Sequence, residues 1–242
     1  MRNSISFKVH GRYALFSDPI TRVGGEKFSY QIPTYEALKG ICESIYWKPT
    51  FQWVVDSVRI MNPIRMQSQG VRPIFYAGTK ANDLSIYTYL SDVEYEVNAH
   101  FEWDLSRDDL ASDRNEHKHH QIALRMVNKG GRRDIFLGTR ECQAYVEPVT
   151  YGAKKGYYDD KGIIPFDLMF YRFTYPNPKN KKFMAYFWKP TMNHGEIIFD
   201  ASLGDLPSRL IRETEYSLPQ VNFKDSTYEE LIRMEESNEL DQ

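Results

Sequence analysis

The sequence of 242 residues contains only two cysteines, Cys42 and Cys142. Two cysteines cannot build the disulfide framework of a small secreted domain, and their scarcity is typical of a reducing compartment. No apolar run approaches the roughly 18 residues that a membrane-spanning helix needs. Residues 1–11 alternate between polar and apolar types, whereas a signal peptide has a continuous apolar stretch. We therefore expect a cytoplasmic protein without a membrane span.

An excess of charge of one sign is also missing. The 31 Lys and Arg residues nearly balance 33 Asp and Glu residues, which gives a net charge of −2. A polyanion would therefore have to be bound by a local basic patch rather than by the overall charge. The hydrophobic fraction of 41% and the charged fraction of 26% are typical of a folded globular chain.

Hydrophobic periodicity predicts an α+β fold. Alternating or β-branched segments predict strands, and apolar stripes at helical spacing predict helices. The expected elements are strands at 5–9, 51–61 and 140–147, a long hairpin in 84–105 that turns at Ser91-Asp92, and helices at 34–48 and 113–129. Their order is β-α-β-β-α-β, the ferredoxin-like plan that RNA recognition motifs also use.

The ends of the two helices carry recognisable signals. Thr34 and Asp113 are expected N-caps, because a short polar side chain can accept a hydrogen bond from the first turn. Lys48-Pro49 should end the first helix, since proline disfavours helical geometry in the residue before it. This places Tyr46 in the last helical turn.

The composition changes after Pro148. Residues 1–148 are expected to form the ferredoxin-like, RNA-recognition-motif-like domain. A small antiparallel β domain should occupy residues 149–223, with strands at 163–173, 183–189 and 196–199. Residues 224–242 contain seven acids and two bases and form an acidic tail.

Three histidines lie within four residues: His117, His119 and His120, with Lys118 between them. Imidazole can donate or accept a proton at neutral pH, and an ammonium group can stabilise a developing negative charge. This pairing suits cleavage of a phosphodiester through attack by the ribose 2′-OH, without a metal or another cofactor. A solvated helix start with a chance cluster is the plain alternative. A metal site is a third option, because His117 and His120 are spaced i,i+3, but no nearby pattern completes a zinc set.

Tyr46 is the second candidate. A tyrosine in a last helical turn is most often amphipathic packing, and a phenol with a pKa near 10 is a base only when it is strongly perturbed. Its hydroxyl could more easily orient a 2′-OH by hydrogen bonding.

The segment from Lys129 to Arg133 combines two glycines with basic residues. Glycines let a backbone approach a phosphate, and arginines bind phosphate through two hydrogen bonds. A helix stop with solvated arginines is equally compatible with the pattern. The candidate RNA-binding residues are His117, His120, Lys48, Arg114, Arg132, Arg133 and Lys27.

Three segments together resemble a known family. They are GGEKFSYQIPTYEALKGICESIYWKPTF at 24–51, RNEHKHH at 114–120 and GGRRDIFLGTRECQAYVEP at 130–148. In order and spacing they resemble the CRISPR-associated Cas-five family, d type, of subtype I-C. The resemblance covers nearly the whole chain and thins after about residue 150.

The resemblance implies a fold and a function. It implies an RNA-recognition-motif-like domain and a small β domain. It also implies an endoribonuclease that cuts precursor CRISPR RNA within the repeat, at the base of its hairpin, without a metal. The enzyme would then hold the 5′ handle beside the backbone and large subunits of the subtype I-C interference complex.

The family's catalytic groups fall on Tyr46, Lys118 and His119. We expect Lys118 to stabilise the phosphorane, His119 to transfer a proton, and Tyr46 to position or deprotonate the 2′-OH. The family often has a small residue where this chain has His117, which leaves open whether His117 or His120 contributes. Two alternatives remain: a subunit that binds the 5′ handle without cutting, and a metal-dependent nuclease acting on DNA. Duplex DNA is a further candidate ligand of the basic segments.

Overall fold

The computed structural model describes residues 3–18, 21, 25–72, 84–176 and 180–213. None of the helices in these ranges has the length and apolar character to cross a membrane. The predicted acidic tail, 224–242, lies outside the described residues. The helices are α1 (Tyr35–Ile45), α2 (Glu116–Asn128) and the 3₁₀ turns η2 (Asp108–Asp113) and η3 (Leu203–Asp205). The strands are β1 (Ser4–Ala14), β2 (Phe51–Ile60), β3 (Met66–Val71), β4 (Ser85–Trp103), β5 (Ile135–Phe136), β6 (Gln143–Pro148), β7 (Ile163–Pro165), β8 (Met169–Thr174), β9 (Lys182–Trp188), β10 (Thr191–Asn193), β11 (Glu196–Ile198) and β12 (Ser208–Glu213).

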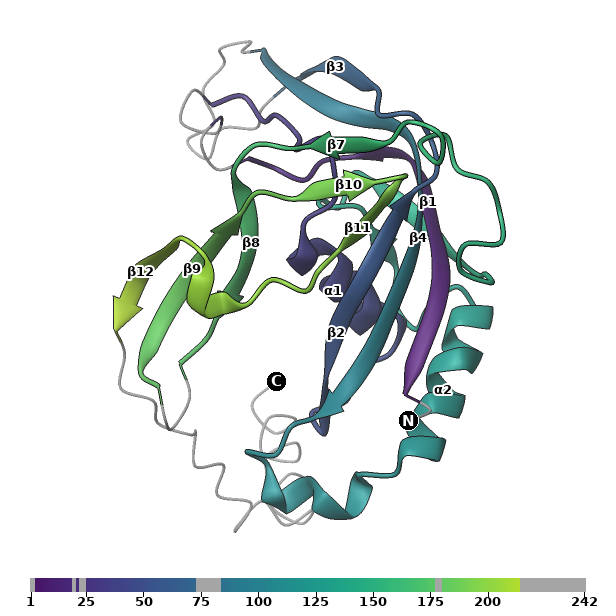
Figure 1. Cartoon of the computed structure of the whole chain (residues 1–242), viewed down its shortest axis with the longest axis vertical. Coiled ribbons are helices and arrows are strands. Elements are labelled where there is room, and N and C mark those ends of the chain that lie inside the picture. The colour runs from purple at the N-terminus through teal and green to yellow at the C-terminus, as the bar shows by residue number, and fades with distance from the viewer. Residues whose placement is uncertain (1–2, 19–20, 22–24, 73–83, 177–179, 214–242) are drawn as a thin grey trace, which may run out of the picture.

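Most strands join one large sheet (Figure 1). Its order is β5-β6-β1-β4-β2-β11-β10-β7, and β3 pairs with the first part of β4. All of these pairings are antiparallel. Helix α1 packs against β2, and α2 packs against β1 and β6. The prediction that the chain combines helices and strands in an α+β fold is confirmed, and the observed sheets are mostly antiparallel.

Helix α1 forms as its sequence predicts. The Thr34 side chain accepts a hydrogen bond from the Ala37 N–H at 3.2 Å, and the buried stripe includes Leu38, Ile41 and Ile45. These side chains share one hydrophobic core with the inward-facing residues of the sheet, such as Val55 of β2, the strand against which α1 packs. Burial of this stripe drives the docking of the helix, because each fully buried aliphatic side chain contributes about 1.5–3 kcal/mol. The end of α1 is thereby fixed against the sheet.

The predicted hairpin turn at Ser91-Asp92 is wrong. Strand β4 continues through both residues, and Asp92 only distorts it with a left-handed φ of 52°. Pairing explains the continuity, because β3 pairs with residues 85–90 and β1 pairs with residues 90–100. Hydrogen bonds on both sides of this point outweigh the local turn preference of Ser and Asp.

The part of the chain after Pro148 is divided between two sheets. Strands β8, β9 and β12 form a separate three-stranded antiparallel sheet. Strands β7, β10 and β11 instead extend the large sheet, since β11 pairs with β2. The prediction that 196–199 pairs within one small sheet with 183–189 is therefore wrong.

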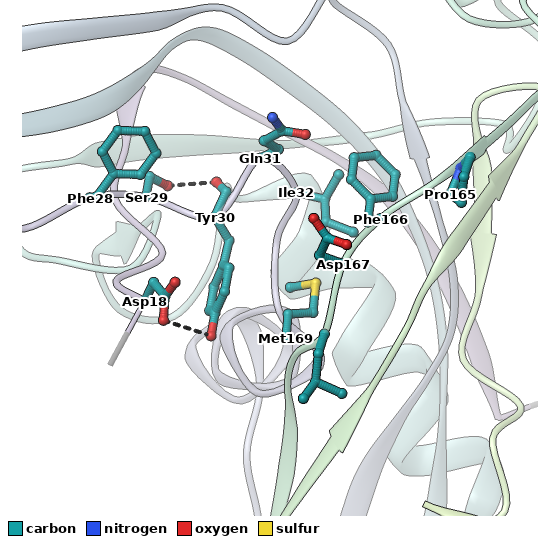
Figure 2. A pocket seen from close by; sticks show the side chains of 11 residues that line it. Asp18, Phe28, Ser29, Tyr30, Gln31, Ile32, Pro165, Phe166, Asp167 and Met169 are labelled. Atoms are coloured by element: carbon teal, nitrogen blue, oxygen red, sulfur yellow. Dashed lines mark hydrogen bonds between the residues drawn. The ribbon is translucent and has the colours of Figure 1, made fainter. Parts of the chain in front are cut away.

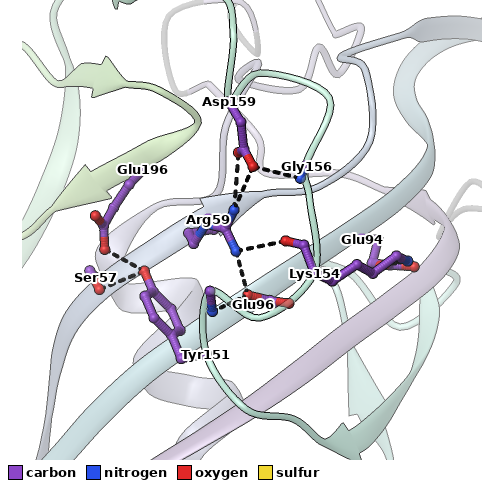
Figure 3. A network of polar contacts seen from close by, with 10 residues as sticks. Ser57, Arg59, Glu94, Glu96, Tyr151, Lys154, Gly156, Asp159 and Glu196 are labelled. Atoms are coloured by element: carbon purple, nitrogen blue, oxygen red, sulfur yellow. Dashed lines mark hydrogen bonds and ion pairs between the residues drawn. The ribbon is translucent and has the colours of Figure 1, made fainter.

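A buried polar network fastens the segment 151–159 to the large sheet (Figure 3). The Arg59 guanidinium on β2 donates to Glu96 at 2.9 Å and to both carboxylate oxygens of Asp159 at 3.0 Å. Glu96 also accepts from the Gly152 N–H at 2.9 Å. Both charges of the buried Arg59–Glu96 pair are thus compensated, and removing either partner would leave the other uncompensated.

Candidate active site

The chain leaves α1 at Tyr46 and turns sharply there. Tyr46 donates its N–H to the Cys42 carbonyl at 3.0 Å but has an extended backbone, with φ −158° and ψ 127°. The Tyr46 carbonyl accepts the indole N–H of Trp53 at 2.7 Å. Tyr46 is therefore the C-cap of α1, and the prediction that it lies in the last helical turn is off by one residue.

The start of α2 is different from the prediction as well. Asn115, not Asp113, is the N-cap, and its side chain accepts from the Lys118 N–H at 3.0 Å. Asp113 ends the 3₁₀ turn before the helix, and its carboxylate binds other groups. The register of this first turn directs His119 into the interior, whereas His117 and Lys118 are exposed.

Tyr46 and His119 form a direct hydrogen bond. The Tyr46 hydroxyl lies 2.7 Å from His119 Nδ1, although 73 residues separate them in sequence. His119 Nε2 lies 2.7 Å from the backbone carbonyl oxygen of Asp113. Because a carbonyl can only accept, Nε2 carries a proton, and in the neutral ring Nδ1 accepts the proton of the Tyr46 hydroxyl. The phenol, the imidazole and the Asp113 carbonyl form one continuous hydrogen-bonded chain.

Asp113 connects this chain to Lys118. Its carboxylate accepts from Lys118 Nζ at 2.5 Å and from the Thr50 hydroxyl at 2.9 Å, and it lies 3.4 Å from His119 Nε2. The hydrogen bond from Lys118, followed by that from Thr50, lowers the pKa of Asp113 below its ordinary value. Sequence reasoning assigned Asp113 only a capping role. The spacing of five residues between Asp113 and Lys118 is the one sequence feature that could have indicated their ion pair.

The electrostatic surroundings keep Tyr46 protonated. Burial raises the pKa of its hydroxyl, and the negative charge of Asp113 raises it further, while Arg132 and Arg125 act in the opposite direction. A phenol with a raised pKa is a proton donor at neutral pH. The hydroxyl therefore suits hydrogen bonding and proton relay through His119 better than direct action as a base.

The pair is enclosed. His119 is 0% exposed and Tyr46 is 3% exposed. The rings of Phe51, Phe101 and Trp103 surround the imidazole at centroid distances of 5.4, 6.4 and 5.7 Å. The Lys118 side chain, in contrast, is 50% exposed. A phosphate group can thus reach Lys118 at the surface, but it reaches the imidazole only if the surrounding side chains move.

Two predicted arginines lie at the same end of α1. The Arg132 and Arg133 N–H groups donate to the Ser44 carbonyl, at 3.2 and 3.1 Å, and Arg132 also donates to the Ile45 carbonyl. Gly130 and Gly131 permit this approach, because both have positive φ values. The two arginine side chains are exposed and line an open depression of about 570 Å³. Basic groups therefore surround the end of α1 that carries Tyr46.

A family model covers most of the chain. The family model for Cas5d, described as CRISPR-associated protein of the Cas5 type, matches residues 4–200. The chain belongs to the Cas5d family.

The chain is also similar to individual proteins of known sequence or structure. A protein from Thermus thermophilus, named CRISPR pre-crRNA endoribonuclease Cas5d, is 31% identical over 176 residues, or 69% of this chain and 73% of the relative. A protein of the same name from Mannheimia succiniciproducens is 28% identical over 167 residues, or 60% of this chain and 72% of the relative. A crystal structure of a CRISPR-associated protein is 38% identical, with a TM-score of 0.72, over 85% of this chain and 96% of that chain. A functionally uncharacterized protein from Streptococcus mutans has the same identity and coverage, with a TM-score of 0.70.

The other predicted RNA contacts of this Cas5d member are dispersed. Lys48 follows Tyr46 closely in the chain and is half-buried. His120 donates from Nε2 to the Ser4 carbonyl at 3.0 Å, away from the Tyr46–His119 bond. Arg114 donates to the carbonyls of residues 104 and 107, so its guanidinium holds the loop before α2. Lys27 lies over the Tyr87 ring at 4.9 Å, in the region of β3 and β4. The structure thus brings Tyr46, Lys118 and His119 together and leaves His120, Arg114 and Lys27 at separate places.

A further pocket of this Cas5d member, of about 410 Å³, lies between residues 28–32 and 165–169 (Figure 2). The Tyr30 hydroxyl donates to Asp18 at 3.3 Å there, and burial raises the pKa of Tyr30 to about 12. None of the predicted catalytic residues lines this pocket. Within the described ranges, no group of three or more His, Cys, Asp or Glu residues is arranged to hold a metal ion.

Proposed function

We propose that this chain is an endoribonuclease that cuts precursor CRISPR RNA within the repeat, at the base of the repeat hairpin. Two relatives carry the name CRISPR pre-crRNA endoribonuclease Cas5d. The observation that carries the proposal is the 2.7 Å hydrogen bond between Tyr46 and His119, next to the exposed cation Lys118. A proton-transferring pair beside a cation is what cleavage of a ribose-phosphate linkage requires.

In the proposed reaction the ribose 2′-oxygen attacks the adjacent phosphorus and forms a 2′,3′-cyclic phosphate. The bond from phosphorus to the 5′-oxygen breaks, and that oxygen leaves with a proton. Tyr46 and His119 act as one relay: the phenol takes up the proton of the 2′-OH while it passes its own proton to Nδ1 of the imidazole. The reverse transfer supplies the proton that leaves with the 5′-oxygen. Lys118 stabilises the extra negative charge of the phosphorane.

Access to the relay requires an exchange of partners at Lys118. The ammonium group is paired with Asp113, whose backbone carbonyl also blocks His119 Nε2. A phosphate that takes the place of the Asp113 carboxylate would release the 104–115 segment from this corner. We propose that RNA binding opens the site by this exchange.

We also propose the ferredoxin-like arrangement of the first part of the chain and its division from the second part. The order β6-β1-β4-β2 with two connecting helices supports a ferredoxin-like unit within residues 1–148. Contacts across Pro148, such as the pairing of β11 with β2, join this unit to the 149–223 part. We also propose that the product's 5′ handle stays bound and that the chain acts as a subunit of the subtype I-C interference complex.

One observation favours a second function. Because His119 is fully buried, a subunit that holds the 5′ handle without cutting would also be compatible with the site. A metal-dependent DNA nuclease is the third candidate, and the exposed Arg132 and Arg133 would accept the backbone of duplex DNA.

A cleavage assay separates these functions. Repeat RNA is incubated with the full chain in excess EDTA, in parallel with the same RNA carrying a single 2′-deoxyribose just upstream of the cut. We expect the ribose substrate to be cut and the deoxy substrate to be bound but intact. Cutting of the deoxy substrate would refute 2′-OH attack. Loss of all cutting in EDTA would favour the metal-dependent nuclease. Binding of the RNA without cutting, with or without EDTA, would favour the handle-binding subunit.

A further inference from the structure

One face of the three-stranded sheet carries a continuous row of aromatic rings, which we call the aromatic face. It consists of Phe170, Phe173, Tyr175, Phe183 and Phe187. Neighbouring rings contact one another, at 4.5 Å between Phe170 and Phe173 and at 5.2 Å between Phe173 and Phe183. Tyr175 stacks on Phe183 at 5.2 Å with an interplanar angle of 18°.

The aromatic face is separate from the hydrophobic core. The opposite face of the same sheet packs inward, where Tyr171 and Trp188 join the core with Phe199. The rings of the aromatic face, in contrast, are absent from the core cluster. Tyr175 is 61% exposed, and the four phenylalanines are half-buried. In Figure 1 this sheet projects from the side of the large sheet.

Strand register adds positive charge to this face. Arg209 of β12 pairs with Ala185, and Arg212 pairs with Phe183. Directly paired residues of antiparallel strands project to the same side, so both arginines lie on the side of Phe183 and Phe187. Both are exposed, and neither forms an ion pair with a described residue.

The charge balance of the sheet is basic in a chain whose net charge is −2. Two of the four basic residues of β8, β9 and β12, Arg209 and Arg212, lie on the side of the aromatic face. The other two lie on the opposite side, where Arg172 pairs with Tyr186 and Lys182 pairs with the acid Glu213. Two carboxylates of α1 also act near this face: Glu36 accepts the Phe173 N–H at 3.1 Å, and the negative charges of Glu36 and Glu43 add to the rise that burial causes in the pKa of Tyr175. Arg209 and Arg212, which form no ion pair with a described residue, therefore point to an anionic ligand that also offers flat apolar surfaces.

We propose that the aromatic face binds unpaired nucleotides of RNA, as a second RNA contact apart from the cleavage site. Exposed rings on a sheet stack with unpaired bases, and arginines beside them contact the phosphates. A duplex would not use the rings, because its bases are stacked on each other. The inference rests on the proposed function only for the identity of the RNA.

The test measures binding of a fluorescein-labelled uridine oligomer of about 12 nucleotides, within the usual range of single-strand site sizes. Fluorescence anisotropy with the full chain gives Kd over a salt series of about 50–200 mM. The variants are Tyr175→Ala, Tyr175→Phe and the double variant Arg209→Ala/Arg212→Ala. The matched control is Tyr157→Ala/Lys161→Ala, which removes an exposed ring and its cation from the 149–162 segment.

We expect Tyr175→Ala to weaken binding at least about fivefold, the lower end of the cost of losing one base stack. Tyr175→Phe and the control should bind like the wild type. The double arginine variant should reduce the slope of log K against log salt by about 1.4, or 0.7 for each lost phosphate contact. Wild-type affinity of Tyr175→Ala and of the arginine variant would overturn the proposal and leave the face to a protein partner. If Tyr175→Ala and the arginine variant lose as much affinity for an RNA duplex as for the oligomer, the assignment to single-stranded RNA is overturned.

Cleavage of repeat RNA is followed separately in the same samples. If the wild type cuts but the Tyr175 and arginine variants retain full oligomer affinity, only this inference fails. If the wild type does not cut but the variants lose affinity, the proposed function fails and the RNA contact remains.

Discussion

Replacing Tyr46 with phenylalanine tests the relay at one atom. The substitution removes the hydroxyl that donates to His119 Nδ1 at 2.7 Å and keeps the ring that packs on Phe51. The buried Nδ1 then has no donor, which costs about 1–3 kcal/mol of stability. If the hydroxyl relays a proton in the reaction, its loss should also slow cleavage by about 10²- to 10⁴-fold.

A second buried tyrosine provides the control. The Tyr171 hydroxyl donates to the Phe199 carbonyl at 3.4 Å, in the core and away from the site. Tyr171→Phe therefore removes a comparable group and should cost about 1 kcal/mol or less, since the bond is long. Urea denaturation gives the stability of both variants, and single-turnover cleavage with saturating protein gives the chemical rate.

The two variants should differ in rate far more than in stability. Tyr171→Phe should cut at the wild-type rate, whereas Tyr46→Phe should be folded, bind repeat RNA and cut slowly. A folded Tyr46→Phe variant that cuts as fast as the wild type would refute a chemical role of the hydroxyl.

Three further predictions concern the charged groups around the relay. Lys118→Ala should lose most cleavage, and Lys118→Arg should retain part of it; equal rates in single-turnover assays would exclude a role for the cation. Asp113 has a lowered folded-state pKa, so its stabilisation, about 1 kcal/mol or less, is present above its unfolded pKa of about 3.9 and is lost as the pH falls through the folded value. In Asp113→Asn, the urea denaturation midpoint should therefore fall less steeply at low pH than it does in the wild type. An unchanged fall of the midpoint would contradict the ion pair. Arg132→Ala/Arg133→Ala should weaken repeat RNA binding and reduce the salt slope by about 1 for each lost phosphate contact, whereas an unchanged slope would place the RNA elsewhere.

The sequence was most informative where local signals and burial agree. Thr34 and the stripe of Leu38 and Ile41 predicted the start and the buried face of α1, and both are confirmed. The same agreement holds for β2, whose β-branched and aromatic residues pair as a strand on both sides.

The errors arose where specific side-chain hydrogen bonds decide the local structure. Asp113 was predicted to cap α2, but Lys118 and Thr50 bind its carboxylate, and Asn115 caps the helix instead. Tyr46 was predicted to be helical, but the Trp53 indole binds its carbonyl in an extended conformation. Thr50 is distant from Asp113 in sequence, whereas Lys118 and Trp53 lie only five and seven residues from their partners. These two bonds join a side chain to a neighbouring turn, and neither hydrophobic periodicity nor the capping pattern reports such bonds.

For the candidate site, too, the sequence predicted some features and missed others. The motifs around Tyr46 and Lys118-His119 predicted which side chains should converge, and the structure brings them together. Nothing in the sequence predicted that His119 would be fully enclosed by Phe51 and Trp103. Burial depends on how β2, β4 and α2 pack together, and periodicity alone does not report it.

A double-mutant cycle on Tyr46 and His119 tests the central claim most directly. Single-turnover rates are measured for the wild type, Tyr46→Phe, His119→Gln and the double variant, with repeat RNA saturated by protein. If the two groups act as one relay, the double variant cuts no more slowly than the slower single variant. Losses that multiply in the double variant would contradict the account, because they would show that the phenol and the imidazole act independently.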